Sequence, residues 1–140
     1  MEHVINGEGL VLGRLSSQVA KMLLNGDSVT VVNADKLLVS GHVHDLVSKY
    51  KRKIELKDKG NPEHSPYISR RPDMFVKRIV RGMLPYKKPS GKSAYKRLKI
   101  YVRVPETLDG KAKTMESKHA DEVFENVVTV KKLTEMLGYR

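Results

Sequence analysis

Residues 70–99 read RRPDMFVKRIVRGMLPYKKPSGKSAYKRLK, and this stretch, here called the basic segment, guides the interpretation of the whole chain. It holds eleven of the chain's 27 lysines and arginines but only one of its 16 acids, Asp73. The rest of the chain is therefore nearly neutral, although the formal net charge is +11. One concentrated cationic region on a neutral body is typical of a protein that binds a polyanion, above all a nucleic acid. An acidic protein or an anionic membrane remains the alternative at this point.

The first part of the basic segment has the period of an amphipathic helix. Its apolar side chains recur at helical spacing, and they are Phe75, Val76, Ile79, Val80 and Met83. The basic side chains of the opposite face are Lys77, Arg78 and Arg81. Pro72 suits the first helical turn, and Asp73 suits the positive end of the helix dipole. Gly82 and Pro85 are expected to end this helix.

The second part of the basic segment predicts a loop, a short helix and a strand. Residues 83–91 contain two prolines and are expected to form a stiff cationic loop. A second helix is expected from Lys92. Its inward side chains would be Ala94, Tyr95 and Leu98, and its outward side chains would be Lys92, Lys96 and Lys99. Residues 100–104 read IYVRV and predict a strand that Pro105 ends. Each helix would thus have an apolar side for a core and a basic side for phosphates.

The composition allows one domain and excludes several classes of site. The chain has 140 residues and no cysteine, so it forms no disulfide, thiol nucleophile or thiolate metal site. No apolar run approaches the ~20 residues that span a bilayer, and residues 1–3 (MEH) do not begin a signal peptide. We therefore expect no membrane partner, and a cytoplasmic location is compatible with these features.

The order of predicted elements indicates an α/β domain. Residues 29–32 form a β-branched run typical of a strand buried on both faces. Short extended segments are expected at 4–5, 9–12 and 37–39, and helices at 13–24, 43–54, 119–125 and 130–137. The last helix would lie between an N-cap at Thr129 and a C-terminal stop at Gly138. We predict a single domain over 1–140 with a small, mostly parallel sheet flanked by helices and a basic helix-loop-helix surface. Residues 105–140 are expected to form an irregular C-terminal extension.

Three patterns that invite an enzymatic interpretation are incomplete. Residues 7–13 resemble a dinucleotide-binding loop, but Leu12 stands where the third glycine is required. Residues 91–93 (GKS) match the end of a phosphate-binding loop, but Tyr86 stands where its first glycine belongs. The two histidines of residues 42–44 have no further metal ligand at useful spacing. The sequence thus predicts no catalytic residue, metal, cofactor or small-molecule substrate.

Several motifs in the same order resemble those of the ribosomal protein L13 family, a universal family of the large ribosomal subunit. The most specific motif is VRGMLP, which the basic loop follows. The motifs are GLVLGRL at 9–15, VNADK at 32–36, RRP at 70–72, VRGMLP at 80–85 and LKIY at 98–101. This similarity covers most of residues 4–104 and is archaeal in the style of its loops. Arg103 stands where many members have a small residue, and we place no motif after Pro105.

The resemblance implies a compact α/β protein that binds large-subunit rRNA, supports subunit assembly and has no catalytic role. The implied partners are this rRNA and neighbouring large-subunit proteins of the cytoplasmic ribosome. The expected RNA-binding residues are Arg14, Arg70, Arg71, Lys77, Arg78, Arg81, Tyr86, Lys87, Lys88, Lys92, Lys96, Arg97 and Lys99. Tyr86 would stack on an unpaired base or else pack in the ordinary way, whereas Tyr95 is expected in the core. The alternatives are a translational regulator that binds RNA and a nucleotide-dependent RNA-modifying enzyme.

Overall fold

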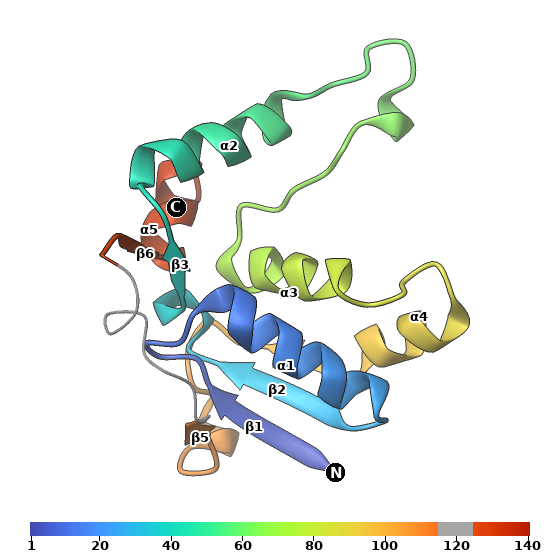
Figure 1. Ribbon diagram of the computed structural model, residues 1–140, viewed down its shortest axis with the longest axis vertical. Coiled ribbons are helices and arrows are strands. Elements are labelled where there is room, and N and C mark those ends of the chain that lie inside the picture. The colour runs from blue at the N-terminus through green and yellow to red at the C-terminus, as the bar shows by residue number, and fades with distance from the viewer. Residues whose placement is uncertain (115–124) are drawn as a thin grey trace.

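The computed structural model describes residues 1–114 and 125–140, and its centre is a small parallel sheet (Figure 1). The strands lie in the order β4-β2-β1-β5, and every neighbouring pair is parallel. Their bounds are β1 (Glu2–Asn6), β2 (Ser28–Val32), β4 (Leu98–Ile100) and β5 (Lys113–Thr114). The predicted small, mostly parallel sheet is thereby confirmed.

The β-branched run becomes the central strand of this sheet. Strand β2 pairs with β1 on one side and β4 on the other, and Val29, Val31 and Val32 are almost fully buried. Thr30, which alternates with them, is also buried. Side chains of a strand alternate between faces, so burial of consecutive residues means that both faces of β2 are covered. This confirms the strand that the sequence predicts there.

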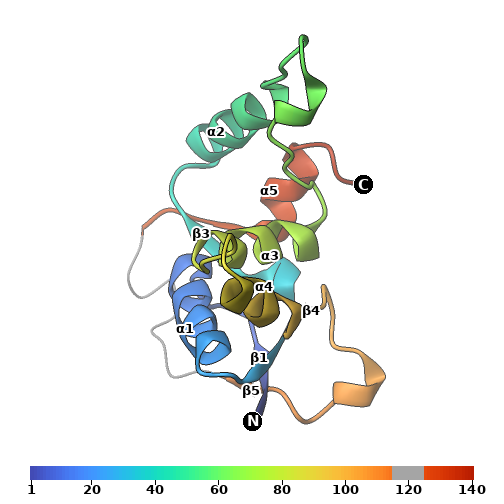
Figure 2. The ribbon, with the colours of Figure 1, turned by 90° about the vertical axis from the view of Figure 1, so that its right-hand side faces the viewer.

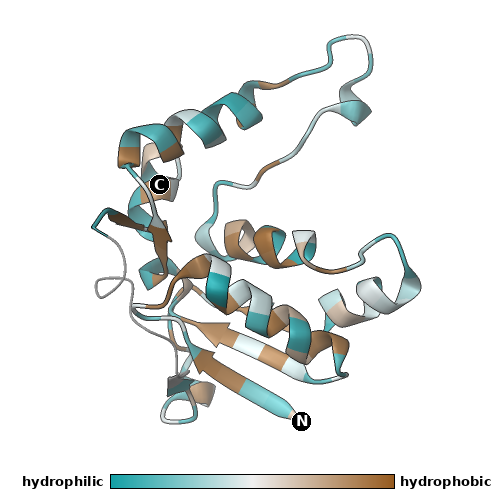
Figure 3. Ribbon diagram, viewed as in Figure 1, coloured by the Kyte–Doolittle hydropathy of each residue, from teal (hydrophilic) through white to brown (hydrophobic). Residues whose placement is uncertain are grey.

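Three helices pack on the sheet and on one another (Figure 2). They are α1 (Leu12–Leu24), α3 (Pro72–Gly82) and α4 (Pro89–Lys96). Helix α1 contacts β2 and both other helices, and α3 contacts β4. The inward residues of α1 and α3 follow the predicted helical period; Leu15, Val19, Phe75, Val76 and Val80 all lie in the core. Figure 3 shows the same division, with apolar residues concentrated in the strands and on one side of the helices.

The C-terminal residues complete the core. Strand β6 (Val127–Thr129) pairs antiparallel with β3 (Leu38–Ser40), and α5 (Val130–Met136) packs on the short 3-10 helix Ala34–Lys36 and on α2 (Val43–Glu55). The Thr129 side chain accepts a hydrogen bond from the Lys132 N–H at 3.2 Å, so the predicted N-cap is confirmed. Gly138 follows α5 with φ of 108°, a conformation that favours glycine. The predicted helix at 119–125 falls almost entirely outside the described residues.

The structure corrects several predicted boundaries. Helix α4 begins at Pro89 and not at Lys92, because a proline is well suited to the first helical turn. The strand predicted at 100–104 is β4, at Leu98–Ile100, where it lies beside β2. Residues 9–11 form no named strand, and α1 already begins at Leu12. Met83 caps α3 and is 43% exposed, and Ile79 is only half-buried, so neither is a full core residue.

Helix α2 leads into a projecting segment, residues 56–71, here called the arm. Figures 1 and 2 place α2 and the arm at the end of the molecule opposite the N-terminus. The apolar stripe of α2 packs against the core only through half-buried side chains. One of them is Tyr50, whose ring centre lies 5.0 Å from that of Phe75. The arm holds one short 3-10 helix, Pro62–His64. Among the described helices, none is long and apolar enough to cross a bilayer.

Candidate nucleic-acid interface

The basic segment folds into two helices joined by a tight loop, and α3, α4 and the loop 83–88 together are called the platform. The loop is anchored by Leu84, which is only 6% exposed. Its backbone is fixed by two short hydrogen bonds, from the Tyr86 N–H to the Leu84 carbonyl at 2.8 Å and from the Lys88 N–H to the Pro85 carbonyl at 2.9 Å. A loop with an anchored side chain and paired backbone groups presents its outer residues in one fixed arrangement.

Gly91 brings α4 against this loop. A Cβ atom added to Gly91 would lie 2.1 Å from the Pro85 carbonyl oxygen and 2.3 Å from its carbon. These are backbone atoms, which cannot rotate away as a side chain could, so only glycine permits the contact. The sequence predicts Gly91 at the end of the loop and within an incomplete phosphate-binding pattern, and its packing role was missed. The one available signal was a glycine in the first turn of a helix that follows a two-proline loop.

Two tyrosines and two cations form a ladder across the platform. The Arg81 guanidinium carbon lies 3.8 Å from the centre of the Tyr86 ring, and the Lys77 ammonium lies 4.9 Å from the centre of the Tyr95 ring. The two rings meet edge to face, with centres 5.4 Å apart. Cations are attracted to the faces of such rings, and edge-to-face ring pairs are themselves stabilising. The ladder therefore ties α3 to the loop and to α4.

The ladder affects the pKa of Tyr95 and the accessibility of the Tyr86 ring. Burial raises the pKa of Tyr95 above its ordinary value, and the nearby Arg81 charge partly offsets this rise. The ring of Tyr95 is half-buried, as is that of Tyr86. One face of Tyr86 already carries the Arg81 guanidinium. Stacking of Tyr86 on a base therefore stays a prediction, and only its other face or its edge is available for it.

Most cations of the platform and the adjoining strand point into solvent. The exposed ones are Arg78, Lys87, Lys88, Lys92, Lys96 and Lys99. Within the described part of the chain, none of them has a carboxylate oxygen within 4.0 Å. Counting partners in residues 1–114 and 125–140, Arg71 is the one basic residue of the segment that is so paired, with Asp73 at 2.8 Å. A surface of unpaired cations attracts phosphates strongly because it has no internal anions to neutralise it.

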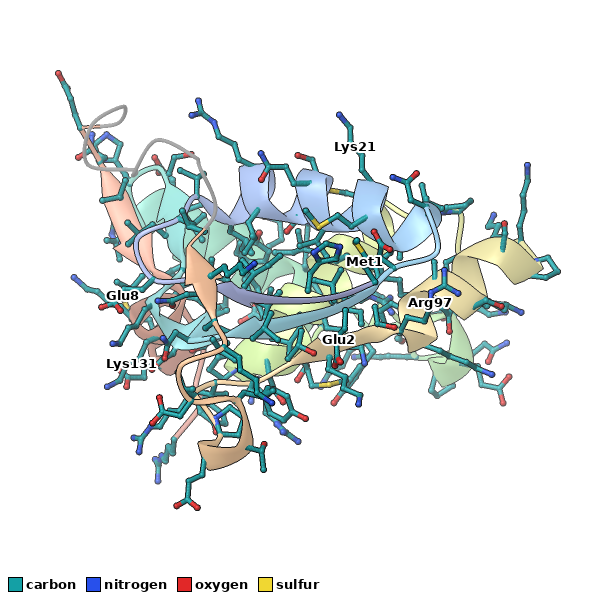
Figure 4. All side chains as sticks on the ribbon, turned by 90° about the horizontal axis from the view of Figure 1, so that it is seen from below. Met1, Glu2, Glu8, Lys21, Arg97 and Lys131 are labelled. Carbon is teal, nitrogen blue, oxygen red and sulfur yellow. The ribbon has the colours of Figure 1, made fainter. Side chains whose placement is uncertain are left out.

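Arg97 has a structural task that the sequence did not reveal. Its guanidinium donates to the Leu23 carbonyl at 2.7 Å and to the Asp27 carbonyl at 3.3 Å, and so reaches from the end of α4 to the end of α1 (Figure 4). The last carbonyls of a helix lack intrahelical partners and carry partial negative charge, which a cation satisfies. Arg97 was predicted to bind RNA, and the structure shows it fastening the platform to α1.

Two other predicted RNA-binding residues lie apart from the platform. Arg14 is exposed in the first turn of α1, about 14 Å along the axis from Leu23, the residue at which Arg97 meets that helix. Arg70 lies at the base of the arm, with its guanidinium close to the position of a Cβ on Gly138, beyond α5. The other predicted residues lie on the platform or directly beside it: Arg71 and Arg97 flank its two helices, and Lys99 lies on β4.

The histidines of residues 42–44 gain no ligand partners in the fold. In the described residues, no three side chains of the histidine, cysteine, aspartate and glutamate types come together as a metal site. His42 precedes the first residue of α2, and His44 lies exposed in its first turn. The platform therefore remains the candidate site, with electrostatic and shape recognition as its chemistry.

Comparison with known proteins gives consistent matches. Residues 1–107 match the family model described as Ribosomal protein L13. A protein of Archaeoglobus fulgidus named large ribosomal subunit protein uL13 is 41% identical, over 98% of this chain and 88% of its own. Proteins with the same name from Methanococcoides burtonii (42%, over 96% of both chains) and Methanosphaera stadtmanae (46%, over 79% of this chain and 78% of its own) also match. The first two alignments extend the similarity past Pro105, where the sequence motifs gave none.

Proposed function

The chain belongs to the ribosomal protein L13 family, and from this premise we propose that it is a structural constituent of the large ribosomal subunit that binds large-subunit rRNA through the platform. The observation that carries the proposal is the set of exposed cations on two helices and a fixed loop, without internal carboxylate partners in the described residues. The names of the relatives support the same assignment.

The affinity would come mainly from phosphate neutralisation. Each lysine or arginine that meets a phosphate releases a condensed counterion, so the logarithm of the binding constant falls as salt rises, by roughly 0.7–0.9 for each phosphate contact. Six exposed cations, from Arg78 to Lys99, are available for such contacts. The binding would therefore be strong at low salt and steeply salt-dependent.

The specificity would come from the fixed shape of the platform. Double-stranded RNA hides its base edges in a deep, narrow groove, so proteins recognise its backbone shape and its unpaired regions. The ladder and the contact between Gly91 and Pro85 hold α3, the loop and α4 at one spacing. A surface that is ordered before binding loses less conformational freedom when RNA docks on it.

The rest of the proposal follows from this scaffold role. The protein would support subunit assembly by joining rRNA segments and by contacting neighbouring large-subunit proteins in the cytoplasmic ribosome. It would use no cofactor and act on no small-molecule substrate, because binding alone accounts for the features of the site.

Charge reversal tests the proposal. Arg78, Lys87, Lys88 and Lys92 are changed together to Glu; all four are exposed and lack a carboxylate partner in the described residues. The matched control reverses four exposed lysines elsewhere, Lys21, Lys111, Lys131 and Lys132. The Kd for a large-subunit rRNA transcript is measured at several salt concentrations, with circular dichroism as the check on folding.

We expect the platform variant to lose at least about a hundredfold in affinity at physiological salt, because several phosphate contacts are lost together. The control variant has the same net charge and should lose less than about tenfold. Equal losses in the two variants would mean that net charge and not the platform carries the binding, and the proposal would then fail.

A further inference from the structure

An exposed aromatic side chain lies on the arm, outside the platform. Tyr67 is 78% exposed, more than any other aromatic residue in the described part of the chain. It belongs to an extended run, residues 66–70, that belongs to no helix or strand. A tyrosine ring at the surface offers a flat apolar face and a hydroxyl, the features by which tyrosines serve in binding interfaces.

A groove lies beside this tyrosine. It measures about 360 Å³ and is lined by Ile54 of α2 and by residues 66–71 of the arm. Its wall therefore combines an apolar side, a tyrosine ring and two arginines, Arg70 and Arg71. An apolar surface next to a cation suits a ligand with a flat aromatic part and an anionic part. A nucleotide has both.

Local hydrogen bonds order the tip of the arm, and free backbone donors lie beside the groove. At its far end, the Asp58 carboxylate accepts from the Gly60 and Asn61 N–H groups at 3.1 and 3.2 Å, and the Ser65 hydroxyl accepts from the Asp58 N–H at 2.8 Å. By contrast, the N–H groups of Tyr67, Ile68, Ser69 and Arg70 have no hydrogen-bond partner in the described residues. Such free donors in an extended segment are well placed to bind phosphate or ribose oxygens.

We propose that this groove holds one unpaired nucleotide of the bound RNA, with its base stacked on Tyr67 and a phosphate at Arg70. The inference rests on the proposed function and adds a second contact to it. RNA is favoured over a protein segment because Arg70 has no carboxylate partner in the described chain and because the groove is continuous with the basic segment at Arg70 and Arg71. Base stacking on aromatic side chains is a common mode of binding single-stranded RNA.

The test compares two substitutions of the same residue. In Tyr67→Phe the ring is kept, and in Tyr67→Ala it is removed; the exposure of the side chain means that neither change disturbs the core. Met136→Ala is the control, because Met136 is 50% exposed on α5 and does not line the groove. The Kd of each full-length variant for a large-subunit rRNA transcript is measured at fixed salt, and the salt dependence is measured for Tyr67→Ala and Arg70→Gln.

We expect Tyr67→Ala to weaken binding by about tenfold, within the range that base–aromatic stacking spans, and Tyr67→Phe and Met136→Ala to stay within twofold. The salt dependence should be unchanged in Tyr67→Ala, since the ring has no charge, and lower by about one phosphate contact in Arg70→Gln. A loss below fivefold in Tyr67→Ala, or an equal loss in Tyr67→Phe, would overturn the inference.

A second readout separates RNA from protein as the occupant. Ultraviolet cross-linking of assembled large subunits should yield a nucleotide attached to the peptide that contains Tyr67. A cross-link from this peptide to a neighbouring protein, without one to RNA, would overturn the inference and leave the proposed function intact. The proposed function itself fails if reversal of the platform charges weakens binding no more than reversal of the four control lysines.

Discussion

The loop of the platform and the arm each join two helices, yet they are held in place by different means. The platform loop, residues 83–88, is fixed by tertiary contacts: Leu84 is buried, and the Pro85 carbonyl meets Gly91 of α4. The arm is fixed at its tip by local hydrogen bonds around Asp58, while Leu56 and Tyr67 remain exposed.

The two regions are therefore held in place by different kinds of interaction. The platform shares the stability of the core, so damage to its loop should weaken the whole fold. The arm depends on its own turn, so damage there should leave the fold unchanged and affect only what the arm binds. Fixed geometry suits the region that we propose contacts most of the phosphates, and a projecting arm suits the proposed contact with a separate feature of the RNA.

The largest difference in stability between the two regions is expected when one methyl group is added to a glycine in each. We expect Gly91→Ala to reduce the free energy of unfolding by about 4 kcal/mol, because its Cβ would overlap the Pro85 backbone. Gly60→Ala, whose Cβ would meet only the Asp58 carboxylate at 3.5 Å, should change it by less than about 0.5 kcal/mol. Urea denaturation of both variants measures the difference, and similar losses would refute the proposed distinction.

A leucine pair gives the next largest effect. Leu84→Ala should cost about 3 kcal/mol of unfolding free energy, because it leaves a cavity under the platform loop. Leu56→Ala, at a side chain that is 54% exposed, should cost less than about 0.5 kcal/mol. Thermal unfolding followed by circular dichroism is sufficient here. A stable Leu84→Ala protein would show that the loop does not need its anchor.

Arg97 distinguishes structural from binding cations inside the platform. Arg97→Gln should lower the free energy of unfolding by about 2 kcal/mol, because the carbonyls of Leu23 and Asp27 lose a charged donor. Lys96→Gln, next to it and exposed, should leave stability unchanged and weaken RNA binding slightly. Stability and Kd are measured on both variants. The reverse pattern would make Arg97 a binding residue first.

The smallest effect concerns two tyrosines, Tyr95 on the platform and Tyr50 on α2, the helix that leads into the arm. Burial raises the pKa of Tyr50 on α2 and that of Tyr95 on the platform, so the folded state holds both protons more firmly than the unfolded state. The two protonated phenols therefore contribute to the free energy of unfolding below the ordinary tyrosine pKa of 10.0. This contribution is lost as the pH rises through the pKa values of the folded state.

Arg81→Gln should raise the pKa of Tyr95 further and leave that of Tyr50 unchanged, because the Arg81 charge lowers the pKa of Tyr95, whereas burial alone raises that of Tyr50. Absorbance at 295 nm, recorded against pH for the native and the urea-unfolded chain, follows the six tyrosines together, and repeating it on Tyr50→Phe and Tyr95→Phe assigns the two groups. Two native tyrosines should ionise later than in the unfolded chain. An unchanged titration in Arg81→Gln would argue against the ladder.

Periodic features of the fold could be predicted from the sequence, and contacts between distant residues could not. The β-branched run at 29–32 and the apolar stripe of α3 carry their own periods, so each predicts an element by itself. The cap at Thr129 is equally local. Strand β5 has two residues, too few to show a period, and only its place beside β1 makes it a strand.

The candidate site divides in the same way. The exposed cations, from Arg78 to Lys99, follow from charge and helical spacing. The role of Arg97 depends on Leu23, 74 residues away in sequence, and nothing near Arg97 points to that contact. The requirement for Gly91 depends on the path of the loop at Pro85. The sequence leaves Tyr86 either to stack on a base or to pack in the ordinary way, and it does not show that Arg81 covers one of its faces.

The late position of α5 and β6 has a consequence for the order of synthesis. Val128, Val130 and Leu133 are core residues, and the Val130 N–H donates to the Leu37 carbonyl at 2.8 Å. A nascent chain translated as far as α4 therefore still exposes the apolar surface around Leu37 that these residues cover. The domain cannot close until its last helix has left the exit tunnel. Until then, the growing chain exposes an apolar surface of the kind that chaperones bind.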